Sequence, residues 1–222
     1  FGGGFYADGA PRGSRRTDPW RLPEARRGRS DSPREGGRMT TGAVLLNLPG
    51  LGNSGEDHWQ THWERRDRGA IRLIQDEWRS PKCRDWVSRL EEFLSNRGGQ
   101  FVISAHSSAC VMVAHWALNS DAPSVGAVRA ALLVAPSDPE APGYPKGPSG
   151  FAPVPLARLP FPTHLVYSSN DPTVTPSRAR AFGAAWGSRL TELQNAGHIE
   201  PRSGFGPWGQ GFAFVEELRR MG

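Results

Sequence analysis

The chain has little cysteine, little lysine and no long apolar run. Two cysteines, Cys83 and Cys110, occur among 222 residues, too few for a disulfide framework. We therefore expect reduced thiols and a cytoplasmic protein, with the Cys110 side chain acting as a small buried hydrophobe. No apolar stretch approaches the roughly 20 residues of a membrane span, so no membrane partner is expected. The Arg15-Arg16 pair precedes no apolar stretch before residue 43, which excludes a twin-arginine export signal.

The positive charge is unevenly placed. Of the net charge of +5, residues 1–39 carry +4 through nine arginines against five acids. The rest of the chain is nearly neutral, so we expect no nucleic-acid partner for the folded body. Only Lys82 and Lys146 are lysines, and an arginine excess of this kind indicates a coding bias more than a binding surface.

Residues 1–39 are rich in Gly, Arg, Pro and Ser and lack periodicity, which predicts a disordered tail. Met39 stands just before the first apolar run. One hypothesis is that Met39 is the natural start and that the preceding residues are not native. The alternative is a genuine basic arm, which would bind nucleic acid in a salt-sensitive way.

Residues 40–222 alternate short apolar runs with helical periods, as expected of one α/β domain. Strands are predicted at 43–48, 71–75, 100–105, 127–135, 163–168 and 189–193. Helices are predicted at 57–68, 82–96, 108–118, 176–186 and 208–219, and residues 136–162 are predicted to form a loop. Right-handed crossovers turn this pattern into a mostly parallel sheet with helices on both faces, in the order 2-1-3-4-5-6.

Ser107 stands where a predicted strand runs directly into a helix, within Ala105-His106-Ser107-Ser108-Ala109. A serine on such a tight turn projects its hydroxyl above the sheet. The usual pattern is G-x-S-x-G, and here alanine replaces both glycines. Because a serine at a strand–helix junction is more often a helix cap, this motif alone does not identify Ser107 as a nucleophile.

Two more residues follow later strands: Asp171 comes after the fifth and His198 after the sixth. A serine hydroxyl needs an imidazole to take its proton and a carboxylate to orient that imidazole. The order Ser, Asp, His, each just past a strand end, is that of the α/β-hydrolases. We therefore predict Ser107 as nucleophile, His198 as base and Asp171 as acid, with Asp138 as the carboxylate to consider if Asp171 lies too far away.

The Gly-rich loop after the first strand, Pro49-Gly50-Leu51-Gly52, is expected to face the nucleophile. The backbone N–H groups of Leu51 and Ser108 are the predicted oxyanion donors. A phosphate-binding loop is the competing interpretation, but its Gly-Lys-Ser/Thr ending is absent.

His58 and His62 have the i, i+4 spacing of zinc ligands. They lack the glutamate that a metalloprotease helix places beside its first histidine. We therefore predict no metal site, and the proposed chemistry needs no cofactor.

These motifs together resemble a known family, the small serine hydrolases related to retinoblastoma-binding protein nine. The resemblance covers about residues 42–220. It rests on Leu48-Pro49-Gly50-Leu51-Gly52, His58-Trp59, Trp63-Glu64, Ala105-His106-Ser107-Ser108-Ala109, Asn170-Asp171-Pro172, Gly197-His198-Ile199, Gly204-Phe205-Gly206 and Trp208. It implies a compact α/β-hydrolase fold without a large cap domain, and an esterase-like triad at Ser107, Asp171 and His198.

The predicted function is hydrolysis of small ester or thioester substrates through an acyl-enzyme on Ser107. The partner is a small acyl compound, and the sequence names no protein partner. Two alternatives stay open: an aminopeptidase or amidase of the same fold, and a catalytically idle interaction module. Comparison of amino-acid amides with simple esters would distinguish the aminopeptidase from the esterase. Failure of an active-site-directed fluorophosphonate to label Ser107 would favour the idle module.

Overall fold

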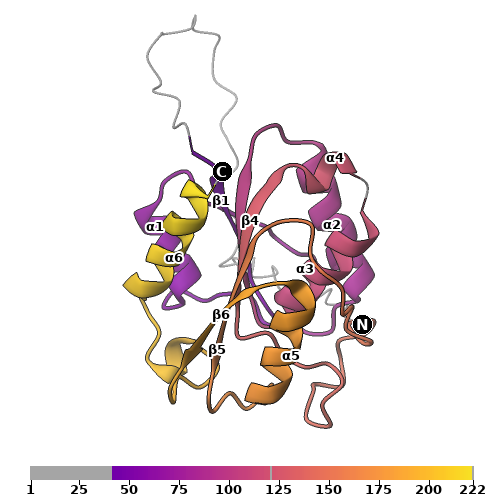
Figure 1. The fold of residues 1–222 in the computed structure, drawn as a ribbon, viewed down its shortest axis with the longest axis vertical. Coiled ribbons are helices and arrows are strands. Elements are labelled where there is room, and N and C mark those ends of the chain that lie inside the picture. Colours follow the sequence, from indigo (N-terminus) through magenta and orange to yellow (C-terminus); the bar gives the residue numbers. More distant parts are fainter. Residues whose placement is uncertain (1–41, 121, 222) are drawn as a thin grey trace, which may run out of the picture. The chain divides into compact units, whose positions relative to one another are not determined.

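A computed structural model describes residues 42–120 and 122–221. A six-stranded parallel sheet forms the core of this part of the chain (Figure 1). The strands are β1 Val44–Leu48, β2 Ile71–Arg72, β3 Phe101–His106, β4 Val128–Val134, β5 Thr163–Ser168 and β6 Arg189–Leu193. Their order is β2-β1-β3-β4-β5-β6, and every neighbouring pair is parallel. The predicted strand order and the interior place of the first strand are confirmed. The predicted tail, residues 1–39, lies outside the described residues.

Helices cover both faces of the sheet (Figure 1). One face carries α1 Trp59–Arg66 and α6 Gly209–Arg220, and the other carries α2 Cys83–Ser95, α3 Ser108–Asn119 and α5 Pro176–Trp186. The sequence analysis did not predict the short helix α4 Ala122–Val125 or the 3-10 turn Pro201–Ser203. The fold is that of an α/β-hydrolase, as predicted.

The strands are apolar on both sides because each face has its own helical layer. In β1, Leu46 belongs to the buried cluster that contains Trp86 of α2, whereas Leu45 belongs to the cluster that contains Trp59 of α1. Successive strand side chains point to opposite faces, so a strand between two layers reads as a continuous apolar run. This is why the run at 43–48 shows no alternation.

Strand β2 is shorter than predicted, two residues instead of five. It is an edge strand with β1 as its partner, and the Leu73 N–H still donates to the Asn47 carbonyl at 3.0 Å. The chain then leaves the sheet. At the following turn the Glu77 carboxylate accepts the N–H groups of Arg79 and Ser80.

The long segment between β4 and β5 packs on the body and forms no separate lid domain. It contains no helix or strand among residues 135–162. The Ser149 N–H donates to the Pro81 carbonyl at 2.9 Å, and the Phe151 ring meets Trp86 edge-on at 5.7 Å between centroids. Phe151 is 1% exposed, so the segment is anchored in the core.

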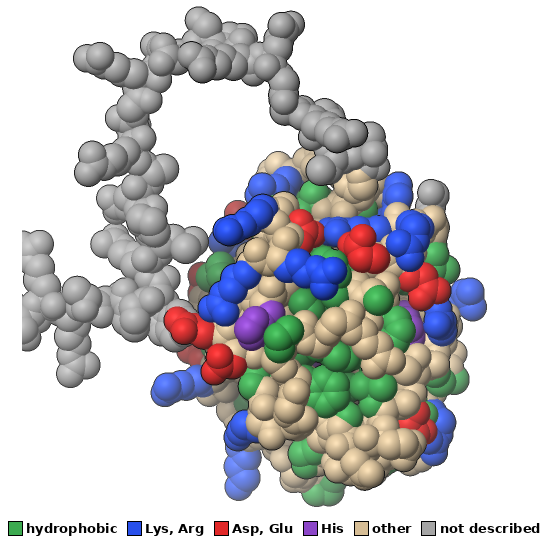
Figure 2. All heavy atoms as spheres, turned by 90° about the vertical axis from the view of Figure 1, so that its left-hand side faces the viewer, with side chains coloured by type: hydrophobic (Ala, Val, Ile, Leu, Met, Phe, Trp, Pro, Cys, Tyr) green, Lys and Arg blue, Asp and Glu red, His purple; other side chains and the backbone are tan. Residues whose placement is uncertain are grey.

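The face of α1 and α6 carries side chains of both charges (Figure 2). Arg219 forms ion pairs with Asp67 and with Glu216, at 2.5 and 2.7 Å, and Arg189 pairs with Glu217 at 2.6 Å. Ion pairs therefore neutralise charges on this face. Among the residues that the structure describes, no helix is long and apolar enough to cross a bilayer.

Both cysteines are buried free thiols. Burial raises the pKa of Cys83 to about 12 and raises the pKa of Cys110 as well. The Cys110 thiol lies behind the nucleophile, 3.4 Å from the Ala105 and Val134 carbonyl oxygens, and it acts as core as predicted.

Candidate active site

Ser107 is the single residue between β3 and α3, and its backbone is strained. Its φ is 59° and its ψ is −130°, outside the regions that non-glycine residues favour. The Ser107 N–H donates to the Val134 carbonyl of the next strand at 2.9 Å, which holds the turn in place. The neighbours at the usual glycine positions, Ala105 and Ala109, are fully buried. A small side chain is tolerated at both places, so the sharp turn forms without either glycine.

The loop after β1 lies directly against this turn. A Cβ atom placed on Gly50 would lie 2.7 Å from the Ser107 Cβ and 2.9 Å from the His106 carbonyl oxygen. Glycine is therefore required at this close approach. The next residue, Leu51, lines the same pocket as Ser107. This places the predicted oxyanion loop beside the nucleophile.

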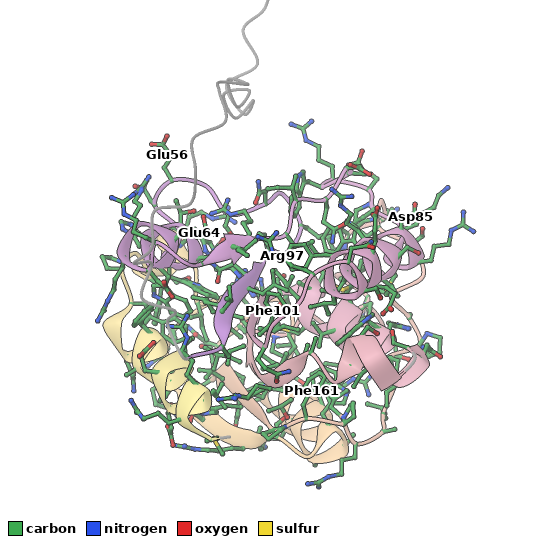
Figure 3. All side chains as sticks on the ribbon, turned by 90° about the horizontal axis from the view of Figure 1, so that it is seen from above. Glu56, Glu64, Asp85, Arg97, Phe101 and Phe161 are labelled. Atoms are coloured by element: carbon green, nitrogen blue, oxygen red, sulfur yellow. The ribbon has the colours of Figure 1, made fainter. Side chains whose placement is uncertain are left out.

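Arg72 of β2 holds this loop from behind. Its guanidinium donates to the Asn53 side chain at 3.2 Å and to the Ser54 carbonyl at 2.7 Å. It also forms a two-point ion pair with Glu64 of α1, at 2.9 and 3.0 Å. Glu64 lies inside the body, whereas Glu56 projects outwards (Figure 3). The loop conformation is therefore fixed by partly buried, charge-assisted contacts.

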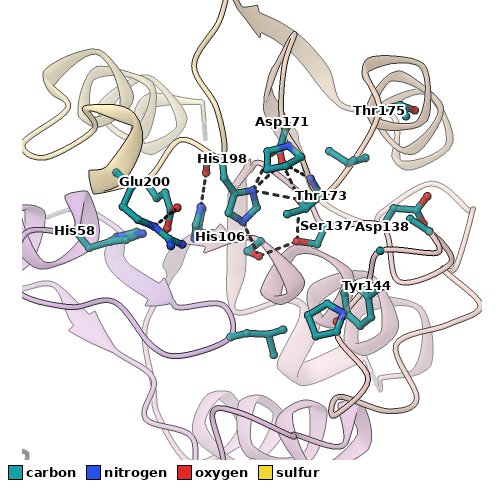
Figure 4. A pocket seen from close by; sticks show the side chains of 18 of the residues that line it. His58, His106, Ser137, Asp138, Tyr144, Asp171, Thr173, Thr175, His198 and Glu200 are labelled. Atoms are coloured by element: carbon teal, nitrogen blue, oxygen red, sulfur yellow. Dashed lines mark hydrogen bonds and ion pairs between the residues drawn. The ribbon is translucent and has the colours of Figure 1, made fainter.

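The three predicted catalytic side chains form one hydrogen-bonded row (Figure 4). The His198 Nε2 atom lies 2.9 Å from the Ser107 hydroxyl oxygen. The His198 Nδ1 atom lies 2.9 and 3.1 Å from the two carboxylate oxygens of Asp171. A carboxylate accepts only, so Nδ1 carries the proton and Nε2 presents its lone pair to the serine. The Asp171 side chain is fully buried, and that of His198 is 13% exposed.

Hydrogen bonds between the loops after β5 and β6 fix the distance between acid and base. The Asn170 side-chain oxygen accepts both the Ser168 hydroxyl and the Gly197 N–H, each at 2.8 Å. The Asp171 carboxylate in turn accepts the N–H and the hydroxyl of Thr173, both at 2.8 Å. The Asn170 contacts therefore tie the loop after β5 to the loop after β6, and the two Thr173 donors orient the acid itself.

Asp138, the other strand-end carboxylate that we considered, faces elsewhere. One of its oxygens lies 3.2 Å from the Arg178 guanidinium, and the other accepts the Glu140 N–H at 3.1 Å. The structure therefore pairs His198 with Asp171.

His106 and Trp59 hold the loop that carries the base, a role that sequence reasoning missed. The His106 Nε2 donates to the His198 carbonyl at 3.0 Å, and the Trp59 indole donates to the Ile199 carbonyl at 2.9 Å. Burial, reinforced by His198 and His58, holds the pKa of His106 well below its usual value, so the ring is neutral. The sequence placed His106 beside Ser107 but did not show its partner.

His58, which together with His62 was considered as a zinc ligand, has partners within the protein. The His58 Nδ1 accepts the Gln60 N–H at 3.2 Å as the cap of α1, and its ring lies 4.9 Å from that of His106. Burial, then the charge of Arg72, lowers the pKa of His58 to about 3. Within residues 42–120 and 122–221, no group of three or more His, Cys, Asp or Glu side chains could hold a metal ion.

Ser137 and Thr173 also belong to the site, and neither was predicted. The Ser137 hydroxyl lies 2.9 Å from that of Ser107 and 3.2 Å from that of Thr173. Both residues follow strand ends, Ser137 after β4 and Thr173 after β5, so the rule that pointed to Asp171 and His198 would also have found them.

The catalytic side chains open into a pocket of about 420 Å³. Its walls mix small apolar side chains with polar groups and one exposed ion pair, between Arg202 and Glu200 at 2.9 Å. Tyr144 forms one wall, and its hydroxyl lies 3.0 Å from that of Ser108. The apolar lining residues are Leu51, Ala141, Pro145, Pro172 and Val174.

Comparisons with known proteins show the same fold. A YdeN-like hydrolase from Pectobacterium atrosepticum superposes with a TM-score of 0.68 and 30% identity over 80% of this chain and 93% of that chain. The ydeN gene product of B. subtilis superposes with a TM-score of 0.60 and 16% identity, over 79% of this chain and 98% of that chain. A Bacillus cereus carboxylesterase superposes with a TM-score of 0.51 and 18% identity, over 79% of this chain and 87% of that chain. No curated protein matches the chain significantly by sequence.

The family of serine hydrolases matches residues 45–217, which include the nucleophile turn, the acid and the base. The narrower resemblance to hydrolases related to retinoblastoma-binding protein nine stays a prediction. Family match, sheet order and site geometry agree, and the chain belongs to the serine hydrolase family.

Proposed function

We propose that the protein hydrolyses small carboxylic esters or thioesters through an acyl-enzyme on Ser107. The observation that carries this proposal is the unbroken row from Asp171 through His198 to the Ser107 hydroxyl, with both contacts of the imidazole at 2.9 Å. A hydroxyl within hydrogen-bond distance of an imidazole nitrogen that can take its proton is prepared for attack on a carbonyl carbon.

In the first half-reaction the Ser107 proton passes to His198 Nε2 as the serine oxygen bonds to the substrate carbonyl carbon. Asp171 stabilises the imidazolium that results. The backbone N–H groups of Leu51 and Ser108 are the proposed donors to the oxyanion. Support for this role comes from the close packing of Gly50 on Ser107 and from the position of Ser108 in the first turn of α3, where backbone N–H groups lack helical partners.

The oxyanion collapses to the acyl-enzyme as the leaving group takes the proton from His198. In the second half-reaction water attacks the acyl-enzyme, with His198 again as base. No external cofactor takes part in these steps.

The size and setting of the pocket support small acyl substrates. A volume of about 420 Å³ lies at the low end of ligand sites, and the segment at 135–162 forms a wall, not a lid domain. A small acyl compound is therefore the proposed partner. The proposed location is the cytoplasm, where both thiols would stay reduced.

Labelling with a fluorophosphonate probe tests the proposal directly. We expect covalent labelling of the parent, none of Ser107→Ala, and parental labelling of Ser95→Ala, which removes an exposed hydroxyl on α2. A panel of p-nitrophenyl esters from acetate to octanoate, acyl thioesters and amino-acid amides then ranks the substrate classes. Equal ester turnover by Ser107→Ala and the parent would contradict the proposal, and faster turnover of amides than esters would favour the peptidase alternative.

A further inference from the structure

The Ser107 hydroxyl has a second partner besides the base. The Ser137 hydroxyl oxygen lies 2.9 Å from it, the same distance as His198 Nε2. Ser137 is 4% exposed, so water has little access to compete for this contact. A second row of contacts continues from Ser137 to Thr173 at 3.2 Å and from Thr173 to Asp171 at 2.8 Å (Figure 4). Two hydrogen-bonded paths therefore join the nucleophile to the acid.

A count of protons shows that the second path is one donor short. Each hydroxyl carries one proton. The Ser107 proton faces His198 Nε2, and the Thr173 proton faces the Asp171 carboxylate, which accepts only. The single Ser137 proton is left with two acceptors, the Ser107 oxygen and the Thr173 oxygen. It therefore has two alternative positions within hydrogen-bond reach.

We propose that Ser137 is a further catalytic residue, whose hydroxyl donates to the Ser107 oxygen when negative charge builds there. This inference rests on the proposed function. During attack the Ser107 proton moves to His198 Nε2, the bond from the serine oxygen to carbon forms, and the carbonyl electron pair moves onto the carbonyl oxygen. Ser137 keeps its own proton throughout and only turns it from Thr173 towards Ser107.

The same donor acts again when the acyl group leaves. The bond between carbon and the Ser107 oxygen then breaks, and that oxygen takes back a proton from His198. A hydrogen bond to a charged oxygen is stronger than one between neutral hydroxyls. The exchange of acceptors by Ser137 thus favours both transition states over the resting enzyme, which is the condition for a gain in rate.

Substitution of Ser137 tests the proposal. We expect Ser137→Ala to lower the acylation rate constant, measured as the burst with p-nitrophenyl acetate, and kcat by about 10- to 100-fold, as loss of one donor to a charged oxygen implies. KM and the melting temperature should stay near the parental values. Ser137→Cys keeps the volume but donates weakly, and we expect a loss in the same direction. Ser95→Ala is the matched control and should match the parent.

The outcomes separate this inference from the proposed function. Parental acylation by Ser137→Ala, or by Ser137→Cys if the alanine variant fails to fold, would overturn the role of Ser137 and leave the triad intact. A loss seen only in KM or in melting temperature would also overturn it, because that pattern marks a hydroxyl that merely joins two loops. A parent that is inert to esters and to fluorophosphonate would overturn both.

Discussion

The Nε2 atom of His106 donates a hydrogen bond to the backbone carbonyl of His198, at 3.0 Å. The residue just before the nucleophile thus holds the backbone of the base. Because burial keeps the His106 ring neutral, it has one N–H, and that N–H is committed to this bond. A displacement of the end of β3 is therefore passed directly to the loop that carries His198, and the reverse also holds.

Loss of this bond should slow catalysis. We predict that His106→Phe lowers kcat about tenfold, since misplacement of a catalytic group by a fraction of an ångström is costly. The matched control is His115→Phe on α3, outside the pocket lining. It removes a hydrogen bond of 2.9 Å between the His115 imidazole and the Phe151 carbonyl. We expect the control to lose stability and keep kcat. Equal kcat values for the two variants would contradict the role of His106.

Asp171→Asn should reduce kcat by about 10³- to 10⁴-fold, because an amide can donate to His198 Nδ1 and so force the wrong tautomer. Asp138→Asn, at the other strand end, should cost less than about tenfold, since Asp138 faces Arg178. Steady-state kinetics on one ester under identical conditions gives the comparison. The reverse ranking would make Asp138 the acid.

Gly50→Ala should lower kcat about 100-fold, because the new methyl group would displace Ser107 or the oxyanion loop. The control on the same loop is Gly55→Ala, where a Cβ atom meets nothing within 4 Å. Fluorophosphonate labelling rates measure the nucleophile itself. A labelling rate of Gly50→Ala equal to that of the parent would contradict this prediction, because the loop would then accommodate the methyl group without displacing Ser107.

His164, far from the site, should make stability depend on pH. Burial, then the charge of Arg189, lowers the pKa of His164 to about 4, although Glu217 opposes the shift. Its ring also contacts Phe214 and the Thr191 hydroxyl. Between pH 6.5 and 4 the unfolded chain binds a proton that the folded chain does not, so stability falls as pH falls.

We predict that His164→Gln loses less stability than the parent between pH 7 and 5, measured as the free energy of unfolding in urea. The pH dependence should be weaker and not absent, because the pKa values of His58 and His106 are lowered in the same direction. Parallel curves for parent and variant would refute the assignment.

The order of the strands and the three catalytic residues could be predicted because both rest on patterns that the sequence shows directly, the alternation of strands with helices and the residue types just past the strand ends. Parallel strands bring their carboxyl ends to one edge of the sheet, so Ser107, Asp171 and His198 could be expected at that edge before any loop conformation was known. The partners of Ser137 and His106 depend on the conformation of individual loops, which no period in the sequence encodes. The early end of β2 was likewise not predicted, since the apolar run from Ile71 continues beyond the last paired residue, Arg72.

The burial of both thiols bears on how the protein can be handled in the laboratory. Gly98 lies in the exposed segment between α2 and β3, at the amino ends of the strands, opposite the pocket, and a Cβ atom there meets nothing within 4 Å. A Gly98→Cys variant would carry one accessible thiol with an ordinary pKa beside two that burial keeps protonated. Maleimide coupling at that position would attach a dye or a solid support at one defined point and leave the mouth of the pocket open to substrate.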